Sequence, residues 1–61
     1  MKITITIYTD NAAFYEESSY YETGRILAKL ANEIKEDHNM NDRKLRDING
    51  NPCGEMVTIA Q

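Results

Sequence analysis

Side chains that could carry out nucleophilic or metal chemistry are scarce in this sequence. Cys53 is the only cysteine and His38 the only histidine. Nothing in the spacing brings the two together, and hydrolase signatures such as G-x-S-x-G are absent. A structural zinc site needs four nitrogen or sulfur ligands, which these two residues cannot supply. We therefore predict a chain that is not an enzyme and carries no cofactor, with Cys53 as a small apolar residue near a hairpin.

Two acidic patterns have simpler explanations than catalysis or metal binding. Residues 47–51 read DINGN, but the glycine of this stretch comes fourth rather than sixth. Thr58 stands where a calcium loop has its bidentate Glu. Turn formation accounts for the same residues. Glu16 and Glu17 are adjacent, and we expect them to meet solvent and the positive end of a helix dipole.

Four cations are available to meet an anion: Arg25, Arg43, Lys44 and Arg46. Arg46 is the most constrained, because it lies between Leu45 and Asp47 in an expected strand. A guanidinium held on a strand suits a phosphate or a carboxylate. The competing interpretation pairs Arg46 with Glu55 across the hairpin or with the adjacent Asp47.

The aromatic residues are concentrated between positions 8 and 21: Tyr8, Phe14, Tyr15, Tyr20 and Tyr21. We predict that Phe14 and one of Tyr20 and Tyr21 belong to the core. The remaining aromatics are candidates for an interface or for stacking on a ligand, because tyrosine brings contact area at low entropic cost.

The elements that must position these residues follow from hydrophobic spacing. Residues 2–9 alternate Ile with Thr and Tyr, which predicts a strand with one apolar face directed to a core. Residues 10–18 form a long loop that begins at the turn formers Asp10 and Asn11. Residues 37–42 read as a polar connector.

A helix is predicted over residues 20–36. Ser19 and Glu22 have the spacing of a capping box at its start. Its expected core face contains Leu27, Leu30, Ala31 and Ile34, extended backwards to Tyr20, Thr23 and Gly24. Gly24 would then permit a close approach to the sheet. The expected solvated face carries Glu22, Arg25, Lys29 and Glu33.

A hairpin is predicted over residues 43–60. Asn49-Gly50 favours a tight turn, but a two-residue loop would place Pro52 in the ladder, where it cannot donate a hydrogen bond. The turn is therefore expected to be the longer Asn49–Pro52, with Gly54 as a bulge. The order predicts an α+β fold of type β-α-β-β, in which one helix covers one face of a mostly antiparallel three-stranded sheet.

Length and charge narrow the class of protein. The 61 residues make one small domain, 1–61, whose single core gives little net stability. Without disulfides or zinc, self-association is the remaining common source of stability. The net charge of -3 argues against a sequence-independent nucleic-acid binder.

No apolar run is long enough to span a membrane, no signal peptide is visible, and one unpaired cysteine fits a reducing compartment. We expect a cytoplasmic protein.

Three segments carry a resemblance to known proteins. They are TDNAAF at 9–14 after an Ile/Thr strand, RILAKLANEI at 25–34, and LRDINGN at 45–51 with Gly54 behind it. Together they resemble a family of very short phage and prophage proteins. The chain departs from that pattern at Pro52-Cys53, where a β-branched residue is expected, which affects the turn geometry rather than the fold.

The resemblance implies antagonism of host antiviral defence, inside the bacterial cytoplasm. Many of the small phage proteins of this kind that have an assigned role sequester a nucleotide-like immune signal, as sponge proteins do, or bind a defence protein, as anti-CRISPR proteins do. The first role predicts a homo-oligomer, because a chain this small cannot enclose a ligand pocket alone. The candidate binding residues for these roles are Asn11, Phe14, Tyr15, Arg46 and Asp47.

Within the sponge hypothesis, Asn11 and Arg46 would bond polar or phosphate groups, while Phe14 or Tyr15 would stack on a base. The alternative uses the acidic and aromatic loop 10–21 against a basic protein partner. A ligand-free regulatory or assembly role is the third hypothesis.

Overall fold

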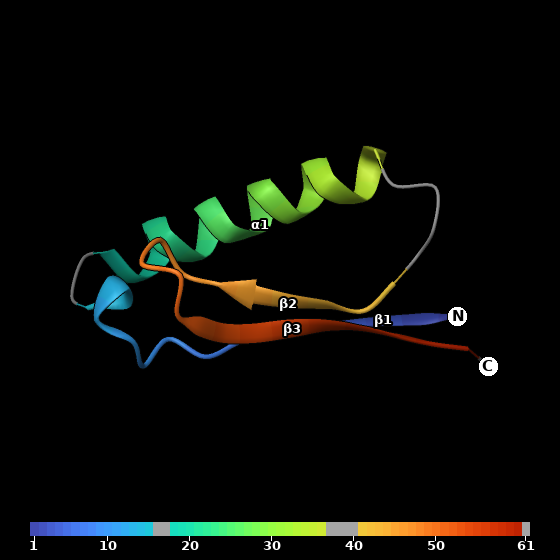
Figure 1. Cartoon of the computed structure of the whole chain (residues 1–61), viewed down its shortest axis with the longest axis horizontal. Coiled ribbons are helices and arrows are strands. Elements are labelled where there is room, and N and C mark those ends of the chain that lie inside the picture. The colour runs from blue at the N-terminus through green and yellow to red at the C-terminus, as the bar shows by residue number, and fades with distance from the viewer. Residues whose placement is uncertain (16–17, 37–40, 61) are drawn as a thin grey trace.

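A computed structural model describes residues 1–15, 18–36 and 41–60 of the chain. The elements follow in the order β1 (Lys2–Ile7), η1 (Ala12–Phe14), α1 (Ser18–Glu36), β2 (Arg43–Arg46) and β3 (Pro52–Ile59). The three strands form one antiparallel sheet of order β1-β3-β2. Helix α1 packs on one face of this sheet (Figure 1). The predicted α+β, β-α-β-β architecture is confirmed. Predictions for Glu16, Glu17 and His38 fall outside the described residues.

Strand β1 is shorter than predicted and less covered. It pairs with β3 from Lys2↔Ile59 to Ile7↔Gly54, so residues 8 and 9 lie beyond it. Ile5 is opposite Met56, which lies in the core under α1. Yet Ile3 and Ile5 remain 41% and 42% exposed. The expectation that this apolar face goes to the core is wrong at these two positions, because β1 is an edge strand that the helix does not fully cover.

The face that helix α1 turns to the sheet includes Leu30 and Ile34, as predicted, but is rotated from the predicted one. Glu22, Ile26 and Leu30 are buried at intervals of four residues, and Ile34 is half-buried. Leu27, predicted for the core, is 41% exposed. Ala31, also predicted for the core, is exposed as well. The buried stripe therefore runs through Ile26 rather than Leu27, and Glu22 lies inside it instead of on a solvated face.

Three further predictions, all for the first turns of α1, are wrong. Tyr20 and Tyr21 are 91% and 78% exposed, so neither belongs to the core. Gly24 is exposed, with nothing near the position of an added Cβ, so it permits no close approach to the sheet. The Glu22 carboxylate bonds Arg25 and Ile48, so the predicted capping box with Ser19 does not form.

The close approach in this fold occurs at Gly54. An added Cβ there would collide with the backbone carbonyl of Thr6 on the neighbouring strand. The ladder shifts at this point: Leu45 pairs with Gly54 and Arg46 with Pro52, which leaves Cys53 as the extra residue of a bulge. The bulge is thus one residue earlier than predicted. It re-aims the side chain of Cys53, which lies in the core.

The hairpin turn begins earlier than predicted. Gly50 N–H donates to the Asp47 carbonyl at 2.9 Å, and Asp47 N–H donates to the Asn51 carbonyl at 2.9 Å. The loop is therefore Ile48-Asn49-Gly50, a three-residue loop with Gly50 at φ +83°. This leaves Pro52 as the first residue of β3, a position that tolerates proline.

The core is small and lies between α1, η1 and strands β2 and β3. Phe14 is 2% exposed, which confirms its predicted core position, and η1 is the element that presents it. Met56 on β3 is completely buried. The buried apolar residues are Phe14, Ile26, Leu30, Leu45, Cys53 and Met56.

Candidate functional site

Two of the predicted binding residues contact each other. Asn11 Nδ2 donates to Asp47 Oδ2 at 3.0 Å and to the carbonyl of Pro52 at 3.0 Å. The backbone N–H groups of Asn49 and Asn51 donate to Asp47 Oδ1 at 2.9 and 3.0 Å. Asp47 is 4% exposed. The pair therefore ties the hairpin turn to the segment after β1, and these bonds occupy the groups that a ligand would need.

The hydrogen bonds of Asp47 also set its charge state. Burial alone raises the pKa of a carboxyl group, because it removes the charged form from water. The bonds from Asn51 N–H, the Asn11 amide and Asn49 N–H outweigh burial, so the pKa of Asp47 lies below its usual value. Asp47 is thus an ionised structural anchor.

A second buried carboxylate lies beside the same turn. Glu22 Oε1 accepts from Arg25 Nε at 2.7 Å, and Oε2 accepts from Arg25 Nη2 at 2.9 Å and from Ile48 N–H at 2.8 Å. Two parallel bonds to a guanidinium are a strong and directional pairing. The bond with Arg25, then the Ile48 N–H, lower the pKa of Glu22 against the opposing effect of burial. Arg25 is consequently engaged within the fold.

Cys53 lies in the core close to these charges. Burial raises the pKa of its thiol, and the nearby carboxylates of Asp47 and Glu22 raise this pKa further. A nucleophilic cysteine needs the opposite shift, because the thiolate is the reactive form. This environment supports the predicted structural role of Cys53.

Phe14 and Tyr15 were both predicted to contact a ligand, and the structure separates them. Phe14 is enclosed in the core and has no face free for stacking. Tyr15 is 64% exposed and directly follows η1. Of the pair, only Tyr15 can meet a partner.

Arg46 is exposed on β2, as a binding role requires. Its Nη1 donates to the carbonyl of Gly50 at 3.1 Å. In the ladder Arg46 stands opposite Pro52, whereas Lys44 stands opposite Glu55. Among the described residues, Arg46 bonds the turn instead of forming the competing pair with Glu55 or Asp47.

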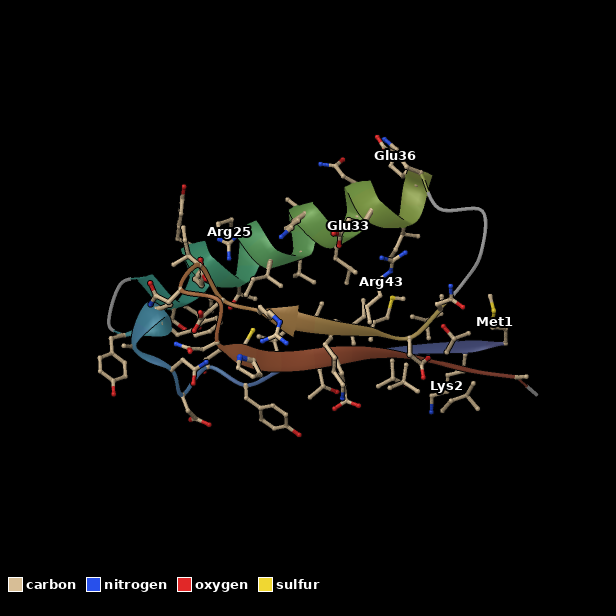
Figure 2. All side chains as sticks on the ribbon, viewed as in Figure 1. Met1, Lys2, Arg25, Glu33, Glu36 and Arg43 are labelled. Carbon is tan, nitrogen blue, oxygen red and sulfur yellow. The ribbon has the colours of Figure 1, made fainter. Side chains whose placement is uncertain are left out.

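A groove between α1 and β2 brings Arg46 and Lys44 together with Lys29, a cation that the sequence did not group with them. It has a volume of about 110 Å³. Ile26, Leu30 and Leu45 form its apolar part, and Glu33 reaches it from the side of α1 that faces the sheet (Figure 2). Its cations are Lys29 from the helix with Lys44 and Arg46 from the strand.

The groove is an electropositive site in an acidic chain. Three cations and one carboxylate line it, although the whole chain has a net charge of -3. Lys44 and Arg46 are among the four cations that the sequence offers to an anion. Lys29 and Glu33 were assigned to a solvated helix face, and no local signal placed that face over β2.

A second depression, of about 150 Å³, lies at the other end of β2. Asp42 and Glu55 line it together with Arg43 and Lys44. Figure 2 shows Arg43 directed from β2 toward α1. The two carboxylates make this depression less suited to an anion than the groove at Arg46.

Metal-ligating clusters and membrane-spanning helices are both absent from the part of the chain that is described. There, no three His, Cys, Asp or Glu side chains converge in a way that could hold a metal ion. No helix among those residues combines the length and the apolar character needed to cross a membrane.

The fold and the site define a small α+β domain with a cationic groove on its helix–strand flank. No protein-family model matches the chain, no curated protein is significantly similar to it, and no solved structure matches its fold significantly.

Proposed function

We propose that this chain is a non-enzymatic binding protein that holds the anionic group of a small ligand in the groove between α1 and β2. The observation that carries the proposal is the convergence of Lys29, Lys44 and Arg46 on an apolar depression. Ammonium and guanidinium groups are the usual protein partners of phosphate.

The size of the groove limits what it can contain. Sites that enclose a whole small molecule have volumes of about 300–1,000 Å³. The groove, at about 110 Å³, has room for one phosphate or carboxylate group. The rest of the ligand would lie outside it, against the protein surface or a second copy of the chain.

The resemblance to small phage proteins gives this binding a biological setting. In that setting the ligand is a nucleotide-like immune signal of the bacterial host, and its sequestration antagonises antiviral defence. A sponge of this kind needs no catalytic group. The roles first assigned to Asn11, Phe14 and Asp47 pass to Lys29 and Lys44, because the former are engaged in holding the fold.

The test is thermal unfolding of the purified chain with and without nucleotides and cyclic nucleotides. A ligand that binds only the folded state raises the melting temperature by mass action. Arg46→Ala and Lys44→Ala should each reduce this rise, whereas Lys35→Ala removes an exposed cation outside the groove and should preserve it. Circular dichroism checks that each variant folds.

Native mass spectrometry identifies the cargo. The protein is incubated with the small-molecule fraction of a phage-infected host lysate and weighed without denaturation. An added mass that disappears in Arg46→Ala but persists in Lys35→Ala supports the proposal. If no anionic ligand binds in either experiment, the groove is not an anion site.

The exposed tyrosines favour a second candidate, an inhibitor that binds a host defence protein. Tyr15, Tyr20 and Tyr21 are all more than half exposed around the start of α1. Tyrosine is enriched at the energetic centres of protein interfaces. Glu22 no longer contributes to this surface, because its carboxylate is buried. Loss of partner binding in Tyr21→Ala, with the nucleotide response intact, would distinguish this role from the first.

A further inference from the structure

The outer edge of β1 presents backbone groups that β3 does not use. Tyr8 N–H donates to the Cys53 carbonyl at 2.7 Å, in line with the register of the β1–β3 ladder. In an antiparallel pair, residues bonded to the neighbour alternate with residues whose N–H and C=O point away. The backbone N–H and C=O groups of the even-numbered residues of β1 therefore face β3. Ile3, Ile5 and Ile7 direct their backbone groups to the outside.

The two edges of the sheet differ in how they discourage pairing. Strand β2 has four residues, three of them cationic, and pairs through a bulge. Short length, charge and bulges are the features that protect natural edge strands. Strand β1 has six residues, no proline and a regular ladder with β3, and its single charge is at Lys2. Only β1 is built to accept another strand.

Exposed apolar side chains lie on this side of the molecule. Ile3, Ile5 and Leu27 are each about two-fifths exposed. Lys29 lines the groove toward β2, and Leu27 lies about 160° round the helix from Lys29. Leu27 is therefore on the β1 flank of α1, on the same side of the sheet as Ile3 and Ile5.

The chain as a whole exposes more surface than a compact monomer of its mass. The accessible surface is 4660 Å², whereas a compact monomer of this mass has about 4,000 Å². Two copies that each buried an area equal to this excess would bury about 1,300 Å² together, which is near the lower end of the range for specific interfaces.

We infer that β1 pairs with β1 of a second copy, in an antiparallel arrangement centred on Ile5. A strand centred on a two-fold axis is its own complement. In this register Ile5 is opposite Ile5 of the second copy and Ile3 is opposite Ile7. Thr4 is opposite Thr6, so like residues meet on both faces. The two Lys2 side chains lie at opposite ends of the interface and do not repel each other.

This arrangement joins the sheets without breaking any hydrogen bond in either copy. The combined strand order is β2-β3-β1-β1-β3-β2, and a two-fold axis normal to the sheet places both α1 helices on the same face. The isoleucines of β1 then line the space between the two helices. Because this inference depends on β1 alone, it is independent of the proposed anion site at β2.

The experiment measures the mass of the full chain by light scattering after size exclusion, across a wide range of concentrations. The wild type is expected at twice 7.0 kDa. Ile5→Lys places two ammonium groups directly opposite each other and should give a monomer. Thr4→Lys puts the same side chain on the other face of the same strand and should remain dimeric.

A charge exchange tests the register and controls for misfolding. Ile5→Glu alone should also be monomeric, but an equimolar mixture of Ile5→Glu with Ile5→Lys should recover the dimer through opposite charges at the central pair. Hydrogen exchange should show the Ile5 amide protected in the dimer and exposed in the monomeric variants. A monomeric wild type, or dimers that survive both Ile5 variants, would overturn the inference. The edge would in those cases be free for an extended segment of another protein.

Discussion

The carboxylate of Glu22 accepts a hydrogen bond of 2.8 Å from the backbone N–H of Ile48, across 26 positions of the chain. The same carboxylate holds Arg25 through two bonds. A residue in the first turns of α1 thus fixes the loop between β2 and β3. The Asn11–Asp47 bond fixes the same loop from the β1 side. The hairpin turn is held from two directions by buried polar contacts.

Replacing Glu22 should destabilise the protein measurably. Glu22→Ala leaves the Ile48 N–H and the Arg25 guanidinium without their acceptor, so the free energy of unfolding should fall by about 2 kcal/mol. Urea unfolding followed by circular dichroism measures this loss. Glu33→Ala removes an exposed carboxylate from the same helix and should change stability by less than about 0.5 kcal/mol. Equal effects from the two variants would mean that the Glu22 contacts contribute nothing.

Acidification should weaken the fold through the same carboxylates. The pKa values of Glu22 and Asp47 are lower in the folded chain than in the unfolded chain, where they are about 4.3 and 3.9. Their contribution is therefore complete above about pH 4.3. It is lost as the pH falls through the lower pKa values of the folded state.

Urea unfolding at a series of pH values tests this dependence. Glu22→Gln cannot titrate at position 22, so its stability should fall less on acidification than that of the wild type. If both proteins lose the same stability between neutral and acidic pH, the lowered pKa of Glu22 is not a source of stability.

The sequence predicts the element order well, because that order depends on local patterns. The Ile3-Thr4-Ile5 alternation predicts β1, and Phe14 is in the core as expected. Asn49-Gly50 predicts the β2–β3 hairpin, although not the bounds of its turn. The rotation of α1 about its own axis, in contrast, does not follow from a local pattern. Ile26 and Leu27 are adjacent and equally apolar, so spacing cannot say which of them is buried.

Contacts between residues far apart in the sequence decide both the rotation of α1 and which residues line the groove. Glu22 faces inward because its partner Ile48 belongs to another element, and a carboxylate is ordinarily expected to be in water. Lys29 reaches the groove only because α1 lies over β2. Arg46 could be proposed from the sequence, but the groove that it lines could not.

Gly24→Ala should stabilise the chain. Gly24 is exposed in the interior of α1, and an added methyl group meets nothing within 4 Å. Alanine is favoured over glycine in a helix by about 1 kcal/mol, which corresponds to a rise of about 4–8 °C in melting temperature for a domain of this size. Gly54→Ala is the matched comparison. Its methyl group would meet the Thr6 carbonyl, so the melting temperature should fall. A fall in both variants would contradict the exposed position of Gly24.

Substitutions of Phe14 and of the exposed tyrosines should differ in their effect on the free energy of unfolding. Phe14→Ala creates a cavity in the core and should cost about 3–5 kcal/mol. Tyr20→Ala and Tyr21→Ala remove exposed side chains, so each should change stability by less than about 0.5 kcal/mol. Chemical unfolding measures all three variants. A large loss of stability in either tyrosine variant would show that the replaced tyrosine packs against the fold and is not available to a partner.

Cys53 should report on the opening of the core. Its side chain is 4% exposed, and burial raises the pKa of its thiol. Both effects slow its reaction, because a thiol reagent needs access and the thiolate form. At neutral pH a chromogenic disulfide reagent should therefore label the folded protein slowly and the urea-unfolded protein at once. Gly54→Ala should label faster than the wild type, since it strains the strand next to Cys53, whereas Gly24→Ala should label no faster. Immediate labelling of the folded wild type would show that the bulge holding Cys53 opens without unfolding of the domain.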